Sequence, residues 1–591
     1  MDIQRDEHNQ NLNQILLEET FYVLTKKNCI FKVRLTRRGL HLIKETDQNL
    51  KEQVIPIRDI VGCRCLRSKK QSKRCVCQSI SRSNSLEVVE DTSGDLDLND
   101  TSAYLYIYAY LFQENKKRER TIVTLRFRSF DKFEDNNREA QRWRTIIKKL
   151  IKGESVSTGN IAEFATSHRH KETRKLLVLC NPKSGAGRAK DIFRDKVIPV
   201  LEEAEIPFDL HLTKHANYAR EFVRTSNLFQ WTGIITVGGD GILYEVLNGL
   251  FERSDWSEVV RTLPLGIVPG GSGNGLARSI AHYYGEPYLP SPTLPAALCI
   301  VRNHCAPMDL VRIETTSQII FSFLSVGWGL LSDIDIESEK LRILGGQRFT
   351  LWSIARLIGL RSYGGKLWYL PADQPARDPK ENVTYSCNIG SNTDLAIDSN
   401  LEAKGRPRVD SWYSANSKRS AYFSATASSY QSAAEEAADS RETNGGDGAE
   451  KPRTYGPASQ IPALTASLSD SDEWRCLAGR FVLVHAGYQS HLGGDFLFAP
   501  DATLNDGRIW LLVVRAGASR AQLLQFLLGL SSGAHATTKT FEGLVQLMPV
   551  RAFRIEPDAG EDGCMTVDGE LVDYGPIQGE VFPSLCRVMV P

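Results

Sequence analysis

The chain has 591 residues, which is too long for one ordinary hydrophobic core and predicts about three folded units joined by linkers. Hydrophobic residues make up 41% and charged residues 24%, a composition typical of folded proteins and not of a disordered chain. The formal net charge of +1 gives no whole-molecule attraction to nucleic acid, so no nucleic-acid partner is expected.

Residues 1–13 are polar and acidic, which predicts the absence of a secretory signal and therefore a cytoplasmic protein. Residues 1–20 are expected to be a flexible N-terminus. No run of about 18 apolar residues occurs, because arginines interrupt the candidate stretches. The most that we expect is peripheral recruitment to plasma or internal membranes. In a cytosolic setting the 12 cysteines are expected to be reduced thiols.

Residues 21–153 combine short strand-like segments with one closing amphipathic helix. In that helix Trp143 and neighbouring apolar residues recur at helical spacing. The arrangement resembles a pleckstrin-homology-like α+β module. Such a module docks to a phosphoinositide or to a protein partner, or it serves only as a packing appendage, and the sequence leaves these readings open. Residues 154–174 are expected to be a linker.

Four cysteines fall within fifteen residues of this module, among many basic side chains: Cys63, Cys65, Cys75 and Cys77. Structural zinc sites commonly place two to four residues between paired cysteines, whereas each pair here is separated by one. A basic surface loop is therefore the favoured interpretation, and metal binding stays the alternative.

From residue 175 to residue 304, apolar strands alternate with helical patterns, which predicts a parallel, Rossmann-like sheet covered by helices, the α/β catalytic lobe. Residues 305–371 and 473–591 read as a second lobe that is β-rich and sandwich-like. Residues 372–472 contain few aliphatic side chains and are expected to be a disordered insertion acting as a spacer.

Three glycine-containing turns each follow a predicted strand of the first lobe and precede a predicted helix. The first contains Asn181, Lys183, Ser184, Gly185 and Gly187. Glycines let a phosphate approach the backbone, and amides at a helix start attract it, although the turn lacks the ending of a Walker loop. Taken alone, such a turn is more often ordinary strand-to-helix punctuation.

The second turn places Asp240 among Gly238, Gly239 and Gly241. A carboxylate in this position can accept the proton of an attacking hydroxyl and help to shape a magnesium site, or it can simply form the turn. The third turn is rich in glycine and hydrogen-bonding groups: Gly271, Ser272, Gly273 and Asn274.

Together, the motifs Asn-Pro-x-x-Gly-x-Gly, Gly-Gly-Asp-Gly and Pro-Gly-Gly-Ser-Gly-Asn resemble the catalytic fold of the diacylglycerol-kinase lipid kinases. The resemblance implies ATP and Mg²⁺ as cofactors and Asp240 as the catalytic base, with Asp240 also near the metal of Mg-ATP. It further implies ATP contacts at Asn181, Thr213, Glu245 and Ser272. Departures are small: Gly238 stands where several relatives have serine, and Lys183-Ser184 replaces a frequent Arg-Gly.

The segment from Ser325 to Arg342, continued by residues 347–350, is similar to the sphingosine kinases specifically. Asp333, Asp335 and Glu337 alternate with isoleucines and are expected to form an acidic rim for a cationic amine. The resemblance implies that Asp335 recognises the lipid amino group; surface ion pairs are the alternative. It also implies that Arg342 and Arg348 reach the ATP phosphates.

Residues 348–360 form a helical pattern with few charges, which suits an alkyl-chain pocket, contact with a bilayer, or core packing. Candidate lipid-contacting residues are Leu330, Leu331, Phe349 and, by resemblance, His535. Near the C-terminus Asp568, Gly569 and Glu570 match the family's Val-Asp-Gly-Glu motif, which implies that they return to the nucleotide site.

The sequence therefore predicts an ATP-dependent lipid kinase that phosphorylates the primary hydroxyl of sphingosine or sphinganine to give the 1-phosphate. A ceramide or diacylglycerol kinase, and a catalytically idle lipid-binding scaffold, are the alternatives. An assay of the three lipids with labelled ATP separates them.

Overall fold

The computed structural model describes residues 12–23, 29–44, 51–69, 88–89, 97–113, 117–156, 174–271, 273–338, 347–372, 453–469, 471–536 and 545–591. Statements below refer to these residues. Of the predicted insertion, residues 373–452 lie outside them. Within the described ranges, no helix combines the length and apolar character needed to cross a bilayer.

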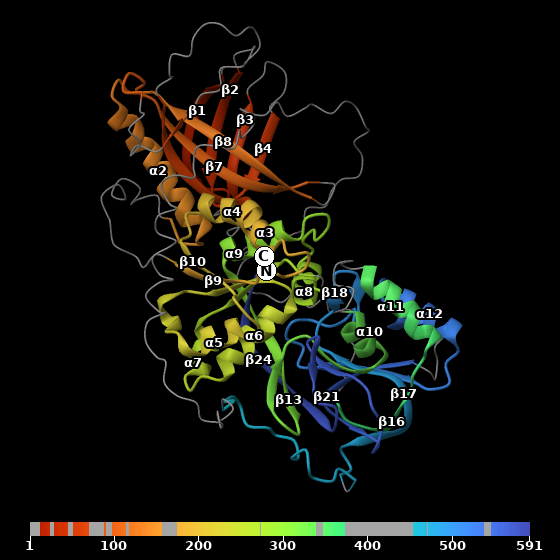
Figure 1. The fold of residues 1–591 in the computed structure, drawn as a ribbon. Helices are drawn as coiled ribbons and strands as arrows, with labels where there is room; N and C mark the ends of the chain where they lie inside the picture. Colours follow the sequence, from red (N-terminus) through yellow and green to blue (C-terminus); the bar gives the residue numbers. More distant parts are fainter. Residues whose placement is uncertain are drawn as a thin grey trace, which may run out of the picture.

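The N-terminal module consists of two four-stranded antiparallel sheets and a helix (Figure 1). The first sheet has the order β1 (Ile15–Val23), β2 (Cys29–Thr36), β3 (Gly39–Lys44), β4 (Lys51–Pro56). The second has the order β6 (Val88–Val89), β5 (Ile60–Ser68), β7 (Ala103–Phe112), β8 (Arg118–Phe127). Helix α2 (Phe133–Ile151) buries Trp143 against Phe21 and Phe127, with ring centroids 6.1 and 6.2 Å apart.

The predicted basic surface loop is wrong for two of the four clustered cysteines. Cys63 and Cys65 lie in β5, and the buried thiol of Cys63 donates to the carbonyl oxygen of Arg144 on α2. Burial raises the pKa of Cys63 to about 12, so the thiol stays protonated. Cys75 and Cys77 lie outside the described residues, which contain no cluster of three or more metal-ligating side chains.

The first lobe contains four parallel strands in the order β10 (Phe208–Leu212), β9 (Leu176–Cys180), β11 (Ile234–Gly238), β12 (Leu265–Pro269). One face is covered by α3 (Ala189–Ile192), α4 (Ile198–Glu203) and α9 (Thr293–Arg302). The other is covered by α5 (Tyr218–Thr225), α6 (Asp240–Phe251), α7 (Trp256–Thr262) and α8 (Gly275–Tyr283). Because the strands are parallel, the turns after β9, β11 and β12 share one edge of the sheet.

The second lobe is mostly antiparallel, with strands β13 (His304–Thr315), β14 (Ile319–Ser322), β15 (Ser325–Gly329), β16 (Tyr363–Pro371), β17 (Arg475–Gly487), β20 (Ile509–Arg515), β21 (Val545–Pro557), β22 (Met565–Val567), β23 (Glu570–Val572) and β24 (Ile577–Val590). A small hairpin pairs β18 (His491–Gly493) with β19 (Phe496–Leu497). The helices of the second lobe are α10 (Leu330–Ser338), α11 (Gln347–Ile358) and α12 (Arg520–Gly529).

Strand β24 joins the two lobes into one continuous sheet. It pairs with β12 in parallel at Leu265 and Val588, and with β13 in antiparallel fashion along most of its length. Figure 1 shows β13 and β24 running from the first lobe into the second. The shared strands fix the positions of the two lobes relative to each other.

The predicted disordered insertion extends too far at its C-terminal end, because residues 453–469 pack on the folded protein. The fully buried guanidinium of Arg554 donates to the carbonyl oxygens of Ala466 and Ala463, at 2.6 and 2.9 Å. The backbone N–H of Tyr455 donates to Phe251 of the first lobe at 2.7 Å. Backbone hydrogen bonding to distant partners holds this segment, and composition alone does not reveal it.

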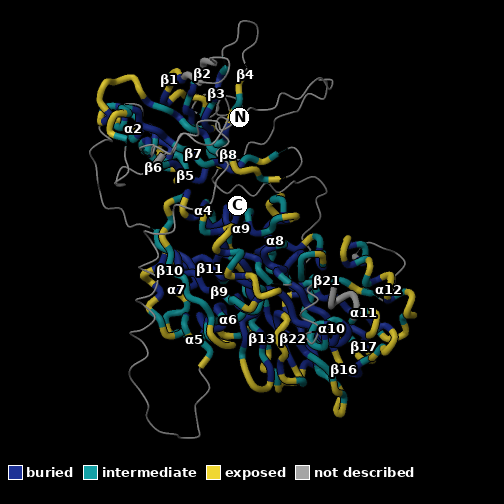
Figure 2. The backbone as a smooth tube through the Cα atoms, turned by 45° about the horizontal axis from the view of Figure 1, so that its top comes forward, coloured by how far each residue is buried: buried dark blue, intermediate teal, exposed yellow. Residues whose placement is uncertain are grey.

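The N-terminal module rests on the first lobe at α4 and α9, as Figure 2 shows. Arg118 of β8 donates to Asp59 and to Glu286, at 2.6 Å in each case, and all three side chains are nearly fully buried. The hydroxyl of Tyr110 donates to Glu203 at the end of α4 at 2.9 Å. The contact is therefore a buried, paired interface rather than a loose tether.

Candidate active site

Asp240 is the first residue of α6 and follows directly from the end of β11. Its Oδ2 atom accepts a hydrogen bond from the backbone N–H of Gly275, the first residue of α8, at 2.9 Å. Burial raises the pKa of Asp240 to about 6, although backbone N–H groups at the start of α8 act in the opposite direction. A carboxylate with a pKa near neutrality suits proton transfer at physiological pH.

The three glycine turns meet beside Asp240. The N–H of Gly239 donates to the hydroxyl of Ser184 at 2.8 Å, and the N–H of Gly270 donates to the carbonyl of Gly238 at 2.7 Å. A Cβ atom on Gly271 would lie 2.4 Å from the Cα of Gly239. Side chains are therefore excluded where two of these turns touch.

Gly185 is required for two reasons. Its φ of +58° lies in the left-handed region, and a Cβ there would lie 2.6 Å from the carbonyl oxygen of Gly270. Gly187 has a φ of +74°. Lys183 is exposed at the same turn, and its N–H donates to the side chain of Asn181 at 3.0 Å. The first turn thus lies beside the other two with a lysine at its rim.

Of the other predicted nucleotide contacts, Thr213 lies at a strand end and Glu245 lies on helix α6. Thr213 follows β10, and its N–H donates to Cys180 at 2.9 Å. The carboxylate of Glu245 accepts the N–H groups of Asn217 and Ala219, at 3.0 and 3.1 Å, and so holds the start of α5. Burial raises the pKa of Glu245. Asn217, which has a φ of +62°, was not predicted from the sequence as a residue of this site. Its only local signal is that it is an asparagine directly before a helix.

The third turn also contacts the second lobe. Asn274 has a φ of +59° and bonds through its side chain to the backbone of Gly271. A Cβ on Gly275 would lie 2.9 Å from the carbonyl oxygen of His491, whose N–H donates to Ser279 at 2.9 Å. Gly273 lies beside Asp240, because a Cβ there would be 3.0 Å from Oδ2. Ser272 lies outside the described residues.

Asp568 has a structural environment that its motif does not reveal. Its carboxylate accepts hydrogen bonds from the hydroxyl of Ser322 and from three backbone N–H groups between β14 and β15: Phe323, Leu324 and Ser325. Burial raises the pKa of Asp568 to about 6, against the effect of these donors. The side chain is committed to the second lobe, so the approach to the first lobe is made by the two residues that follow it.

Gly569 and Glu570 connect the two lobes at the candidate site. A Cβ on Gly241 would lie 2.8 Å from Oε1 of Glu570, and a Cβ on Gly569 would lie 3.2 Å from Oδ2 of Asp335. Gly569 has a φ of +83°, which favours glycine. One hairpin turn thus reaches the glycine turn of Asp240 and the predicted amine-binding carboxylate.

The predicted rim of three acids does not form, because on helix α10 Asp335 points away from the face that Asp333 and Glu337 share. Residues two apart on a helix point about 200° away from each other. Asp333 is buried and accepts a hydrogen bond from the hydroxyl of Tyr363 at 2.5 Å. Glu337 pairs with Arg356. Of the three carboxylates, Asp335 is the one beside the hairpin turn at Gly569.

Three of the four candidate lipid-contacting residues lie in or beside one apolar cluster that includes side chains of α10 and α12: Leu330, Leu331 and His535. Leu330 is buried in it, Leu331 packs against it, and Phe526 of α12 contributes a ring. His535 is buried beside that ring, and its Nε2 atom lies 2.7 Å from the carbonyl oxygen of Phe498. Arg342 lies outside the described residues, and only the backbone positions of Arg348 and Phe349, in α11, are described.

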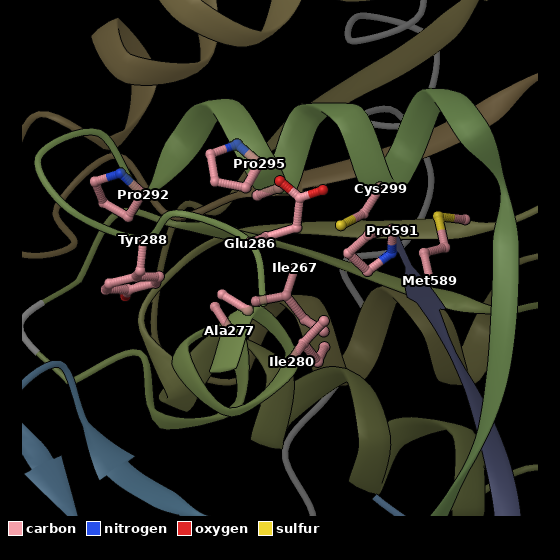
Figure 3. A pocket seen from close by; sticks show the side chains of 12 residues that line it. Ile267, Ala277, Ile280, Glu286, Tyr288, Pro292, Pro295, Cys299, Met589 and Pro591 are labelled. Atoms are coloured by element: carbon pink, nitrogen blue, oxygen red, sulfur yellow. The ribbon is translucent and has the colours of Figure 1, made fainter. Parts of the chain in front are cut away.

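A small apolar cavity lies between α8 and α9 (Figure 3), and none of the residues that line it belongs to the lipid cluster. Its volume of about 20 Å³ holds little more than one water molecule. Its acidic residue, Glu286, is paired with Arg118 and Arg302. We therefore assign it to packing and not to substrate binding.

Comparisons with known proteins agree with this geometry. Residues 175–313 match the model of the diacylglycerol kinase catalytic domain, and residues 466–590 match that of the YegS C-terminal NAD kinase beta sandwich-like domain. The chain is 33% identical to Homo sapiens "Sphingosine kinase 2", over 94% of this chain and 88% of that protein. It is 35% identical to Homo sapiens "Sphingosine kinase 1", over 69% and 89%.

A plant relative and a bacterial structure are also similar to this chain. The chain is 31% identical to Arabidopsis thaliana "Sphingosine kinase 1", over 68% of this chain and 69% of that protein. A crystal structure of a diacylglycerol kinase from Bacillus anthracis str. Sterne overlaps 71% of this chain and 98% of its own, with a TM-score of 0.39 and 15% identity.

The catalytic-domain match and the β-sandwich match define a lipid kinase built from a diacylglycerol-kinase catalytic domain and a β-rich second domain. Within this class, the chain is 33–35% identical to the two Homo sapiens sphingosine kinases over most of their length. The chain belongs to the sphingosine kinase family, and the resemblance stated from its motifs is confirmed.

Proposed function

We propose that this protein transfers the γ-phosphoryl group of ATP to the primary hydroxyl of sphingosine or sphinganine, giving the 1-phosphate. One observation carries the proposal: in a chain of this family, Asp240 lies where three glycine turns of the first lobe meet a hairpin turn of the second. Phosphoryl transfer depends mainly on positioning and electrostatic stabilisation, and this arrangement brings both partners of the reaction to one place.

In the proposed mechanism, the backbone N–H groups of the glycine turns and the ammonium of Lys183 hold the ATP phosphates. Nucleotide contacts are also assigned to Asn181, Thr213, Glu245, Arg342 and Arg348. The primary hydroxyl of the lipid lies beside the carboxylate of Asp240, which takes its proton as the oxygen attacks the γ-phosphorus. The pKa of Asp240, raised to about 6 by burial, leaves the carboxylate ionised at pH 7 and basic enough to accept that proton.

Asp335 is the proposed partner of the lipid amine. Its Oδ2 atom lies by Gly569, and the next residue, Glu570, approaches Gly241. In sphingosine the amine and the primary hydroxyl are on adjacent carbons, so an amine held by Asp335 would keep the hydroxyl on the side of the first lobe. A cationic amine paired with a carboxylate forms a charge-assisted hydrogen bond. Ceramide and diacylglycerol lack that cation, and the acid therefore selects against both.

The residues present fit a magnesium ion. Mg²⁺ prefers one or two carboxylates together with phosphate oxygens. Asp240 of the first lobe and Glu570 of the second lobe both lie next to Gly241. These two side chains would hold the ion, which would supply charge neutralisation at the phosphates. Asp240 would also keep its role as base, since its carboxylate lies at the junction of the glycine turns.

We also propose that the outer end of the second lobe contacts the membrane surface that supplies the lipid, with the protein otherwise cytoplasmic. Helices α11 and α12 lie side by side there (Figure 1). Four of their apolar side chains are exposed by 44–72%: Ile354, Ile358, Leu524 and Leu528. An exposed apolar group of this kind marks a membrane or protein contact.

The remaining assignments concern architecture. We propose a pleckstrin-homology-like fold for residues 21–153, whose ligand is a phosphoinositide or a protein, and a Rossmann-like sheet for residues 175–304. The paired sheets and closing helix of the module support the first proposal, and the four parallel strands support the second. The second lobe would comprise residues 305–371 and 473–591, with the packed segment 453–469 added to it.

The activity is tested by incubating the purified full chain with labelled ATP and, separately, with sphingosine, ceramide and diacylglycerol. Label in the product of sphingosine alone is expected. Label in diacylglycerol would replace the proposal with the broader activity of the catalytic-domain class. Nucleotide binding without label in any lipid would favour an idle scaffold.

A further inference from the structure

His485 is a buried polar side chain with no evident structural task. It lies on β17, is 7% exposed, and packs edge-on against the ring of Phe498, with centroids 5.3 Å apart. Among the described residues, neither nitrogen of its imidazole has a hydrogen-bond partner. Buried polar groups are nearly always paired, and leaving one unpaired costs stability.

A second polar group, the hydroxyl of Ser332, lies close to the His485 ring. Gly327 of β15 is the cross-strand neighbour of both His485 and Thr566. Ser332 of α10 lies over it, with its hydroxyl oxygen 2.9 Å from that of Thr566. A Cβ on Gly327 would lie 2.4 Å from the Ser332 oxygen and 2.8 Å from Nδ1 of His485. Because Gly327 has no side chain, the Ser332 hydroxyl and the His485 ring can both pack directly against its backbone.

This polar position lies just beyond the proposed head-group site. Gly327 is two residues along β15 from Ser325, whose N–H binds Asp568, and strand geometry makes that distance about 7 Å. Alternate residues of a strand share a face, so Gly327 lies on the face of Ser325. Leu330 and Phe498 of the apolar cluster lie on the same side as His485.

We propose that His485, with Ser332 beside it, binds a hydroxyl group that the sphingoid chain carries beyond its amino carbon. The inference rests on the lipid lying in the second lobe, as proposed above. Burial lowers the pKa of His485 to about 3, so the ring is neutral and offers one donor and one acceptor. A wholly apolar chain would leave both unpaired, whereas a hydroxyl satisfies one of them.

Two hydroxyls have this chemistry: the one on carbon 3 of sphinganine, and the additional one on carbon 4 of 4-hydroxysphinganine. Three substrates separate them, namely 2-aminooctadecan-1-ol with neither group, sphinganine with the first, and 4-hydroxysphinganine with both. The value of kcat/KM is measured for each lipid with the wild-type full chain and with His485→Leu, His485→Gln and Ser332→Ala.

The proposal predicts that His485→Leu lowers the preference for a hydroxylated lipid over 2-aminooctadecan-1-ol by roughly tenfold, the usual effect of losing one buried hydrogen bond. His485→Gln, which still forms hydrogen bonds, should retain most of the preference. A drop that appears with sphinganine assigns the carbon 3 hydroxyl, and one confined to 4-hydroxysphinganine assigns the carbon 4 hydroxyl.

An equal loss on all three lipids in His485→Leu would show a packing role and overturn the proposal. If that variant does not fold, as judged by its melting temperature, Ser332→Ala decides: an unchanged preference overturns the proposal. A wild-type protein that phosphorylates the lipids without any preference overturns the inference and leaves the proposed function standing. A wild-type protein that phosphorylates none of them overturns both.

Discussion

Glu570 of the second lobe lies against Gly241 of the first, so closely that a Cβ on Gly241 would come within 2.8 Å of the Glu570 carboxylate. Gly241 directly follows Asp240, and Gly569 on the same hairpin lies beside Asp335. The proposed base and the proposed amine-binding acid are therefore linked by one short turn. The expected effect of a substitution in this region therefore depends on which of these contacts it disturbs.

Removing the charge of Asp335 should weaken lipid binding selectively. Asp335→Asn is expected to raise the KM for sphingosine by about tenfold or more, because a hydrogen bond to a charged group contributes roughly 1.5–3 kcal/mol. The KM for ATP should change little. Steady-state kinetics with each substrate varied in turn measure both constants.

Asp333→Asn is the matched control, since it alters a carboxylate two residues away that is buried against Tyr363. It should lower the melting temperature without a selective effect on the KM for sphingosine. If Asp335→Asn impaired only the use of ATP, the amine-binding role would be wrong.

The contact between glycine turns predicts a large effect of one methyl group. Gly271→Ala places a Cβ 2.4 Å from backbone atoms of Gly239, which cannot yield as a flexible side chain can, so ATP binding should be lost or strongly reduced. Gly494→Ala is the control, because a Cβ on Gly494 would have no atom within 4 Å, and ATP binding should be unchanged. Nucleotide titration of both proteins checks the pair, and equal affinities would argue against the close contact.

The pH dependence should report on Asp240. Its pKa, raised by burial to about 6, means that the basic form is present above that pH and is lost as the pH falls through it. The value of kcat/KM should therefore decline below about pH 6. Circular dichroism over the same range separates this titration from unfolding. A flat profile from pH 5 to pH 8 in a folded protein would remove the support for a base of this pKa.

The exposed apolar group on α11 and α12 should matter only when the lipid is presented in a bilayer. Ile358→Glu, at a side chain that is 72% exposed, is expected to reduce cosedimentation with vesicles and activity on vesicle-bound sphingosine. Activity on detergent-dispersed sphingosine should persist. Leu98→Glu, equally exposed on the N-terminal module, is the control. Equal vesicle binding by both variants would place the membrane contact elsewhere.

Local sequence signals were sufficient for the parallel strands and their turns. Strand β12 (Leu265–Pro269) ends directly before the third glycine turn, as predicted, because a short apolar run followed by glycines is a local feature. The same reasoning brought Asp240 and Gly271 to one edge of a sheet. The contact between Gly271 and Gly239 adds the reason why glycine is needed there.

Features that depend on long-range packing were not predictable. The alternating acids from Asp333 to Glu337 were expected to form one rim, but a helix separates Asp335 from the other two, and only tertiary structure identifies Asp335 as the one at the hairpin turn. Asp568 was expected at the nucleotide, but it binds backbone groups about 245 residues earlier in the chain. Its motif gives no signal of that partner. The ordered segment 453–469 is likewise held by distant residues such as Arg554.

The most direct test of the account compares phosphoryl transfer from labelled ATP to sphingosine by the wild-type protein and by Asp240→Asn. The amide oxygen can still accept the N–H of Gly275, so the variant should keep its fold and bind ATP. Loss of the base should reduce turnover by roughly 10²- to 10⁴-fold. Near-normal turnover by a folded Asp240→Asn protein would contradict the account.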